Sequence, residues 1–291
     1  MIPGDQSLIL EHMYYLNNTN GHQPDQPRGL WETWGRGQIL GLTILLMAGN
    51  FFFQILFYLA REDLFLPVLA GSVLGVLLPA FLIARRFGFS FRRTFSLSLP
   101  HPLVLIASAL MALCSLIPTS LLAELSMRLR PVDPQWESFF QDHLPTTTFE
   151  IILVVVTVVA VAPLAEEIIF RGLLYRLTSS MWGAAPAAVV SALVFGLIHG
   201  EPWFLFGLIG VGLMLAFVYE TTRSVTACWV AHAVHNSISL WAMLGNEGAI
   251  VESQSITVQD WGLAAASVAG MLLVGKFLLA VGKPRHLPEG L

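Results

Sequence analysis

The chain has 291 residues, of which 55% are hydrophobic and 12% charged, and its mean hydropathy is +0.70. Soluble domains carry about 25% charged residues, so this composition excludes an ordinary soluble domain and predicts a polytopic membrane protein. The net charge of −4 argues against a nucleic-acid partner, and we expect none. Cys114 and Cys228 both lie in apolar segments, and we expect them to pack as free thiols rather than to form a disulfide.

In chain order, residues 1–37 read as a polar leader, with Trp31 and Trp34 where interfacial aromatic residues belong. The leader has no basic stretch before an apolar core, so we expect no signal peptide. Residues 38–291 are predicted to form one transmembrane domain with a catalytic core at about 150–244. The fold class is therefore an all-α membrane helix bundle of about eight transmembrane helices. The predicted spans are 38–60, 66–84, 103–125, 150–177, 180–200, 203–222, 224–244 and 261–282.

The distribution of basic residues predicts the orientation of these spans. An even number of spans places both termini on one face of the membrane. Ten basic residues fall on that face, namely Arg28, Arg36, Arg85, Arg86, Arg92, Arg93, Arg176, Arg223, Lys283 and Arg285. The other face has Arg61, Arg128 and Arg130. By the positive-inside rule we expect a multi-pass protein of the bacterial inner (cell) membrane with both termini in the cytoplasm.

The fourth predicted span carries the most unusual polar residues of the chain. Glu166, Glu167 and Arg171 follow an apolar run, and a charge at the centre of a membrane helix costs about 2.5–3.5 kcal/mol on insertion scales. Glu167 and Arg171 are four residues apart and share a helix face, which predicts a structural ion pair. Glu166 lies about 100° away around the helix. Three roles are open to Glu166: pairing with a distant arginine, facing the polar interface, or acting as a catalytic group.

Two later apolar segments carry polar groups at the same spacing. Phe195 precedes His199 by four residues, and His232 precedes Asn236 by four. A buried carboxylate beside a neutral imidazole suits a general base that activates water. An amide and a second imidazole suit the stabilisation of an oxyanion. We therefore expect these groups to line one cavity that opens to the cytoplasm or laterally between helices.

This expectation meets a geometric conflict and several simpler interpretations. His199 lies near the outer end of the fifth span, so contact with Glu166 requires that helix to start late, near Pro186, and to break at residues 200–202. Phe195 is expected to pack and to brace the turn that aims His199. His199 and His235 also fit buried hydrogen-bonding roles, Asn236 fits a bridge between helices, and Glu201 fits an interfacial position.

The three motifs resemble those of the CAAX prenyl protease 2 family, within the wider group of CAAX proteases and bacteriocin-processing or abortive-infection proteins. The first motif is Glu166-Glu167 followed, after three residues, by Arg171. The second is Phe195 four residues before His199, and the third is His232 four residues before Asn236. Order and spacing agree over about 150–244, and the family's eight-helix bundle agrees with the count of spans.

The resemblance implies a glutamate-dependent intramembrane endopeptidase. It implies that Glu166 and His199 activate water, that His232 and Asn236 stabilise the oxyanion, and that Glu167 and Arg171 hold their helix in place. The implied partners are the lipid bilayer and a membrane-associated or lipidated peptide or protein substrate, and CAAX-type C-terminal processing stays open. No cofactor is expected. The alternatives are a zinc site built from the same residues, a transporter or proton-relay protein, and a membrane scaffold whose polar groups are structural.

Overall fold

The computed structural model describes residues 29–61, 63–245 and 257–282, and these ranges contain helices and no strands. The first 28 residues, most of the loop before the last helix, and the basic residues Lys283 and Arg285 lie outside them. The elements are α2 (Leu30–Thr33), α3 (Arg36–Arg61), α4 (Phe65–Ala70), η1 (Gly71–Leu77), α5 (Leu78–Arg86), α6 (Phe91–Thr94), α7 (Pro102–Leu129), α8 (Pro134–Asp142), α9 (Thr148–Val155), η2 (Val156–Val161), α10 (Ala162–Glu167), η3 (Ile168–Tyr175), α11 (Arg176–Trp182), α12 (Ala184–Ile198), α13 (Leu205–Thr222), α14 (Val225–Gly245) and α15 (Val258–Val281).

Each of the eight predicted spans is helical, which confirms the all-α fold class. Six helical segments within the described ranges are long and apolar enough to cross a membrane. The other two are α12, which has 15 residues, and α14, whose histidines, asparagine and serines lower its hydropathy. The count of eight spans is therefore approximate, and both helices that depart from it carry predicted site residues.

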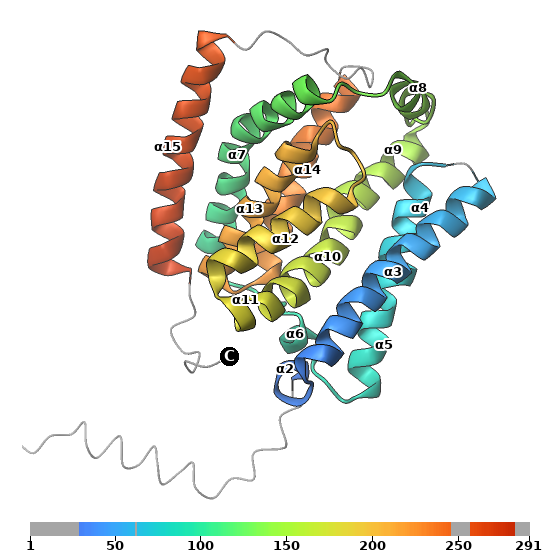
Figure 1. Ribbon diagram of the computed structural model, residues 1–291, viewed down its shortest axis with the longest axis vertical. Coiled ribbons are helices and arrows are strands. Elements are labelled where there is room, and N and C mark those ends of the chain that lie inside the picture. The colour runs from blue at the N-terminus through green and yellow to red at the C-terminus, as the bar shows by residue number, and fades with distance from the viewer. Residues whose placement is uncertain (1–28, 62, 246–256, 283–291) are drawn as a thin grey trace, which may run out of the picture.

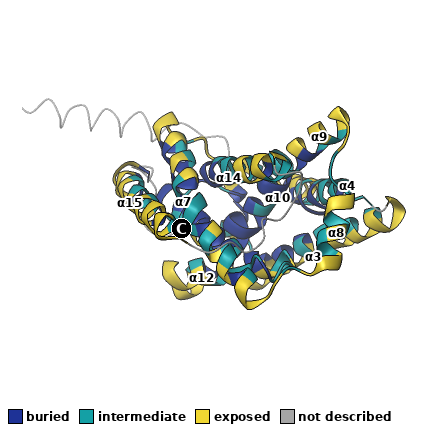
Figure 2. Cartoon of the chain, turned by 90° about the horizontal axis from the view of Figure 1, so that it is seen from above, coloured by how far each residue is buried: buried dark blue, intermediate teal, exposed yellow. Residues whose placement is uncertain are grey.

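The helices pack as a bundle with an apolar outer surface. Figure 1 shows α15 along one outer side and α3, α4 and α5 along the other, with α10, α13 and α14 between them. Viewed from above, exposed residues face outward and buried residues gather between the helices (Figure 2). Many of the exposed side chains are large and apolar, as on α3 and α15. A surface of this kind is suited to contact with lipid hydrocarbon.

Helix α3 packs closely against η1 because small residues face each other. A Cβ added to Gly75 would lie 2.4 Å from the carbonyl carbon of Gly49, so neither position has room for a side chain. Small residues at such contacts let membrane helices approach until their backbones touch. This contact holds the second span, formed by α4, η1 and α5, against α3 at one outer side of the bundle.

The fourth predicted span is one continuous helix of 35 residues, Thr148–Trp182, longer at both ends than expected. Two stretches of it, η2 and η3, have wide turns with i→i+5 hydrogen bonding. Pro163 lies two residues after the end of η2 and has no N–H to donate to the preceding turn. The Val158 carbonyl, five residues before it, is consequently available to a side chain of another helix.

The loop predicted at residues 126–148 contains an unpredicted short helix, α8. The local sequence explains it, because the Asp133 side chain accepts a hydrogen bond from the backbone N–H of Gln135 and Pro134 occupies the first turn. Trp136 of α8 stacks on Phe140 and contacts Trp203 in the loop that follows α12. Aromatic packing thus ties α8 to the end of the bundle where α12 and α13 meet.

Candidate active site

Glu167 and Arg171 form the fully buried centre of the site. An Arg171 Nη1 hydrogen bond reaches Glu167 Oε1 at 3.0 Å, and both side chains are fully shielded from solvent. Arg171 also donates from Nη2 to the Gly212 carbonyl at 2.9 Å. Gly212 is required there, since a Cβ would lie 2.8 Å from the Ala192 Cα. The predicted ion pair therefore forms, and it joins the fourth span to α13.

His232 extends this pair toward Glu166. Its Nδ1 lies 2.9 Å from Glu167 Oε1, the same oxygen that accepts from Arg171. Glu167 Oε1 already accepts a hydrogen bond from the Arg171 guanidinium, so it is also the acceptor in its contact with His232. The proton of the neutral His232 ring is therefore assigned to Nδ1. Nε2, the other ring nitrogen, lies 3.7 Å from Glu166 Oε2. Glu167 thus has a second partner that the helix spacing alone did not reveal.

Glu166 occupies a less enclosed position than its neighbour. Its side chain is 23% exposed, and His232 is its one ion-pair partner among the described residues. The structure therefore gives it neither of the simpler roles considered from the sequence, pairing with a distant arginine or an interfacial position. It faces a cavity.

His199 lies at the C-terminal end of α12. Its Nδ1 lies 2.6 Å from the Phe195 carbonyl, and a carbonyl can only accept, so Nε2 is left without a proton in the neutral ring. Gly200 follows with a φ of +71°, which ends the helix at once. With 15 residues α12 is about 22 Å long, shorter than the ~30 Å hydrocarbon core. A contact between His199 and Glu166 required this helix to start late and to break early. The structure shows both features.

Phe195 packs at the junction of the motifs. Its ring is buried and contacts the rings of His199 and His232 at centroid distances of 4.6 and 5.7 Å. Arg171 lies over the same ring, with its Cζ 5.2 Å from the centroid. One aromatic side chain therefore restrains both histidines and the buried arginine, which extends the bracing role expected for it.

Asn236 bridges two helices. Its Nδ2 donates to the Val158 carbonyl of η2 at 3.0 Å. Val158 is the i−5 residue of Pro163, so within the wide turn its carbonyl has no backbone donor available. The side-chain amide carries two hydrogens, and one remains for another acceptor.

The four candidate residues Glu166, His199, His232 and Asn236 all line one cavity of about 570 Å³. Apolar side chains make up much of the remaining wall, including Phe65, Phe140 and Phe204. Ligand sites typically measure about 300–1,000 Å³ and combine an apolar wall with a few polar groups. Glu166 shares the cavity with His199, the partner that the family resemblance implies, and its ion-pair contact is with His232.

The cavity lies away from the end of the bundle where Arg176 lies. Its lining residues come from the start of α4, the later turns of α7, the end of α8, η2 and α10, the last turns of α12 and α14, and the start of α13. Most of these parts lie toward the end of the bundle that carries α8 (Figure 1). The short α12 contributes to this position, because it places the histidine motif and its loop at that end. An opening to the cytoplasm or laterally between helices stays a prediction.

Further polar residues line the cavity, among them Thr119, Glu201 and His235. His235 and Thr119 share a hydrogen bond of 3.2 Å between Nε2 and Oγ1, and no sequence signal linked α7 to the site. Glu201, which was expected to be solvated or interfacial, also lines the cavity. Burial raises the pKa of the Glu201 carboxyl, and the nearby His199 partly offsets this effect. The signal in the sequence for Glu201 was its position two residues after His199, between Gly200 and Pro202.

Zinc binding by these same residues was the alternative mechanism considered from the sequence. Among the described residues no three His, Cys, Asp or Glu side chains are grouped to hold a metal ion. His232 directs Nδ1 at Glu167, and Asn236 directs its amide at a backbone carbonyl. The two cysteines are free, as expected, and the buried Cys228, one turn before His232 in α14, donates its thiol to the Leu215 carbonyl.

Fold and site together define a class: an integral membrane helix bundle with a glutamate–histidine cavity among its helices. Residues 148–238 match the model of the family described as type II CAAX prenyl endopeptidase Rce1-like. This confirms the resemblance predicted from the three motifs, all of which lie inside the matched segment.

Two curated proteins are similar over part of the chain. One is a candidate membrane peptidase of Bacillus subtilis (strain 168), YdiL, 29% identical over 111 residues, which cover 37% of this chain and 44% of that protein. The other is an uncharacterized protein of Mycoplasma capricolum subsp. capricolum, 28% identical over 93 residues, which cover 31% of this chain and 27% of that protein. The chain therefore matches less than half the length of either relative. No solved structure matches the chain.

Proposed function

We propose that this protein is an intramembrane endopeptidase that hydrolyses a peptide bond with a water activated by Glu166. The observation that carries the proposal is the pairing of a cavity-facing Glu166 with a His232 whose opposite nitrogen is fixed by Glu167. The similarity of residues 148–238 to type II CAAX prenyl endopeptidases supports the same reaction class. We propose a membrane-associated or lipidated peptide or protein as the substrate, taken from the bilayer.

The 3.7 Å between Glu166 Oε2 and His232 Nε2 suits one bridging water. Both atoms are acceptors when Nδ1 holds the His232 proton, so a water between them donates one hydrogen to each and directs a lone pair into the cavity. The geometry favours His232, rather than His199, as the partner of Glu166 in holding the water. His199 then offers its free Nε2 as an acceptor elsewhere in the cavity.

In the proposed reaction, Glu166 takes a proton from the water as its oxygen attacks the carbonyl carbon of the substrate. The carbonyl π electrons move to oxygen, and the second N–H of Asn236 donates to this oxyanion. When the carbonyl reforms, the carbon–nitrogen bond breaks and Glu166 returns its proton to the leaving amine. General base catalysis contributes typically 10²- to 10⁴-fold, and one oxyanion donor on the order of 10²- to 10³-fold.

Glu166→Gln tests the proposal directly, because it keeps the size of the side chain and removes the base. We expect purified enzyme in liposomes to lose on the order of 10²- to 10⁴-fold of its cleavage rate. The assay compares a farnesylated CAAX peptide with an unmodified membrane peptide, followed by mass spectrometry of the products. Glu137→Gln in α8, which does not line the cavity, is the matched control. Cleavage by Glu166→Gln at the wild-type rate would refute the proposal.

We expect the reaction to need no tightly bound metal, because Glu166 is needed as the base. Using Glu166, His199 and His232 as zinc ligands would remove that base. The measurement is cleavage activity after exhaustive chelation, together with the metal content of the purified protein. Stoichiometric zinc, with activity lost on its removal and restored on its return, would contradict the metal-free mechanism.

A further inference from the structure

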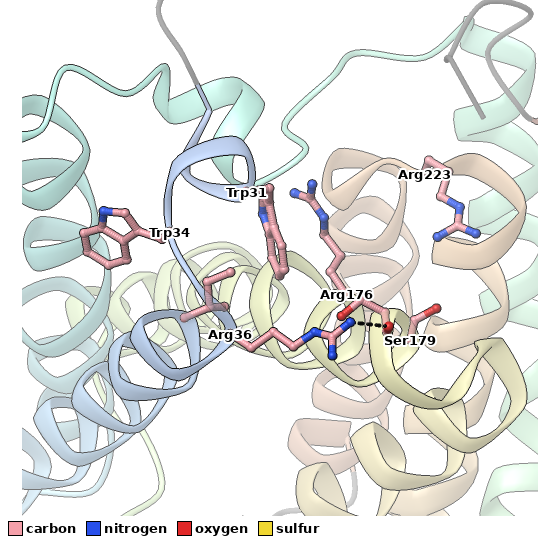
Figure 3. Close-up of a pocket in the computed structure, with 8 residues that line it drawn as sticks. Trp31, Trp34, Arg36, Arg176, Ser179 and Arg223 are labelled. Atoms are coloured by element: carbon pink, nitrogen blue, oxygen red, sulfur yellow. Dashed lines mark hydrogen bonds between the residues drawn. The ribbon is translucent and has the colours of Figure 1, made fainter. Parts of the chain in front are cut away.

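A second cavity lies at the opposite end of the bundle from α8. We call it the arginine pocket; it measures about 370 Å³, and its walls include Trp31, Trp34, Arg36, Arg176, Ser179 and Arg223 (Figure 3). Three guanidinium groups therefore line one small space. Neither the cleavage reaction nor the three motifs involve these residues.

The positive charge of the pocket is incompletely balanced. Arg36 donates from Nη2 to the Ser180 carbonyl at 3.1 Å. Arg176 donates from Nη1 to the Thr94 carbonyl and to Ser96 Oγ, at 2.9 and 3.1 Å. Among the described residues neither arginine has a carboxylate partner, and only Arg223 is paired, with Glu220 at 2.7 Å. Two guanidinium groups thus keep unshared charge toward the pocket.

The pocket is also preorganised. Trp31 donates from Nε1 to the Thr94 carbonyl at 3.0 Å, and the Arg176 Cζ lies 4.2 Å from the centroid of its ring. Contacts to Thr94 and Ser96 hold Arg176 in place from a different part of the chain. A guanidinium fixed in this way loses little further freedom when it binds an anion, and its planar fork matches the oxygens of a phosphate.

Next to the charged groups lies a surface that suits lipid chains. Leu40 and Ile44 lie one and two turns further along α3 from Arg36, and both are exposed. Trp31 and Trp34 stand at the end of the same apolar helix, a position that aromatic residues favour at the membrane interface. The pocket therefore joins a cationic head site to a hydrocarbon-facing helix.

We propose that the arginine pocket binds the phosphate of an anionic phospholipid headgroup, with the acyl chains along α3. A lipid phosphate and free inorganic phosphate both present oxyanions that Arg36 and Arg176 can hold. Basic pockets between membrane helices bind lipid head groups on this principle. The acyl contact favours the lipid, because a free ion gains nothing from Leu40 and Ile44.

The test uses the full chain purified in detergent, with phosphatidylglycerol, phosphatidylcholine or inorganic phosphate added. We expect phosphatidylglycerol to raise the thermal unfolding midpoint, with native mass spectrometry showing one retained molecule, and the other two to leave the midpoint unchanged. Arg36→Gln should weaken phosphatidylglycerol binding about fivefold, as expected for one basic residue near a lipid surface. Arg36 is exposed at the start of its helix, so this change leaves the fold intact.

Arg85→Gln is the matched control, since Arg85 is an exposed arginine of the same end that does not line the pocket. It should bind phosphatidylglycerol as the wild type does. Equal losses in the two variants would show a general surface charge effect and overturn the pocket. An equal stabilisation by inorganic phosphate would overturn the lipid assignment, and no stabilisation by either anion would overturn the site.

Discussion

At the scale of single residues, the two adjacent glutamates have sharply different surroundings. Glu167 is fully buried and shares one oxygen between Arg171 and His232, whereas Glu166 is 23% exposed and faces the cavity. Helix spacing predicted the Glu167–Arg171 pair. It did not predict the hydrogen bond to His232, because that contact depends on the placement of α14, 65 residues later in the chain. Helix spacing predicts contacts within about one turn, whereas the site is assembled from helices that lie far apart in the chain.

Glu167→Gln should therefore reduce stability far more than Glu166→Gln. Removing one partner of a buried pair leaves the other charge uncompensated, at a cost of about 3–5 kcal/mol. Glu166→Gln should change the free energy of unfolding by less than about 1 kcal/mol, as for typical substitutions outside such features. Thermal unfolding in detergent measures both, with Glu124→Gln, in the partly exposed pair with Arg128, as the control. Equal unfolding midpoints for the two glutamate variants would refute this division of roles.

At the scale of the elements, the sequence predicts which segments are helices and misplaces several of their ends. Apolar runs are a strong signal, so all eight predicted spans are helical. The short α8 was missed because its nine residues carry no long apolar run, and its start depends on the capping of Asp133. The wide turns of η2 and η3 were also missed, although Pro163 marked their region. Their hydrogen-bond partners, such as Asn236 for Val158, come from another helix.

Close packing of α3 on η1 gives a prediction at this scale. Gly75→Ala should destabilise the protein by about 1–3 kcal/mol, because the new Cβ meets the Gly49 backbone at 2.4 Å and overpacking forces the helices apart. Gly41→Ala in α3, the helix that Gly75 of η1 packs against, is the matched control, since a Cβ there meets nothing within 4 Å. The control should leave stability unchanged or raise it by up to about 1 kcal/mol, because alanine favours a helix. Denaturation curves that rank the two variants in the opposite order would show that the contact is loose.

At the scale of the whole molecule, charge divides the bundle into two unlike ends. Seven described arginines lie at the end with α2, α6 and α11, which is held together by hydrogen bonds from Arg36 to Ser180, from Arg176 to Thr94 and from Val225 to Ser96. The α8 end has Arg61, Arg128 and Arg130, together with most of the described acidic residues. The same division sets the two cavities apart, because the candidate active site extends toward the acidic end and the arginine pocket occupies the basic end.

We expect the arginine-rich end to face the cytoplasm of a bacterial cell, with both termini there and the active-site cavity opening on the opposite side. Single cysteines at Gln135 in α8 and at Arg85 in the last turn of α5 report the two ends, since both positions are exposed. The native cysteines give little background because Cys228 is fully buried and Cys114 packs toward Gly270 of α15. In intact cells a membrane-impermeant maleimide should label the cysteine at position 135, and label the one at position 85 only after permeabilisation. The reverse pattern would invert the orientation and place substrate entry on the cytoplasmic side, while labelling of both in intact cells would show that the two ends are not separated by the membrane.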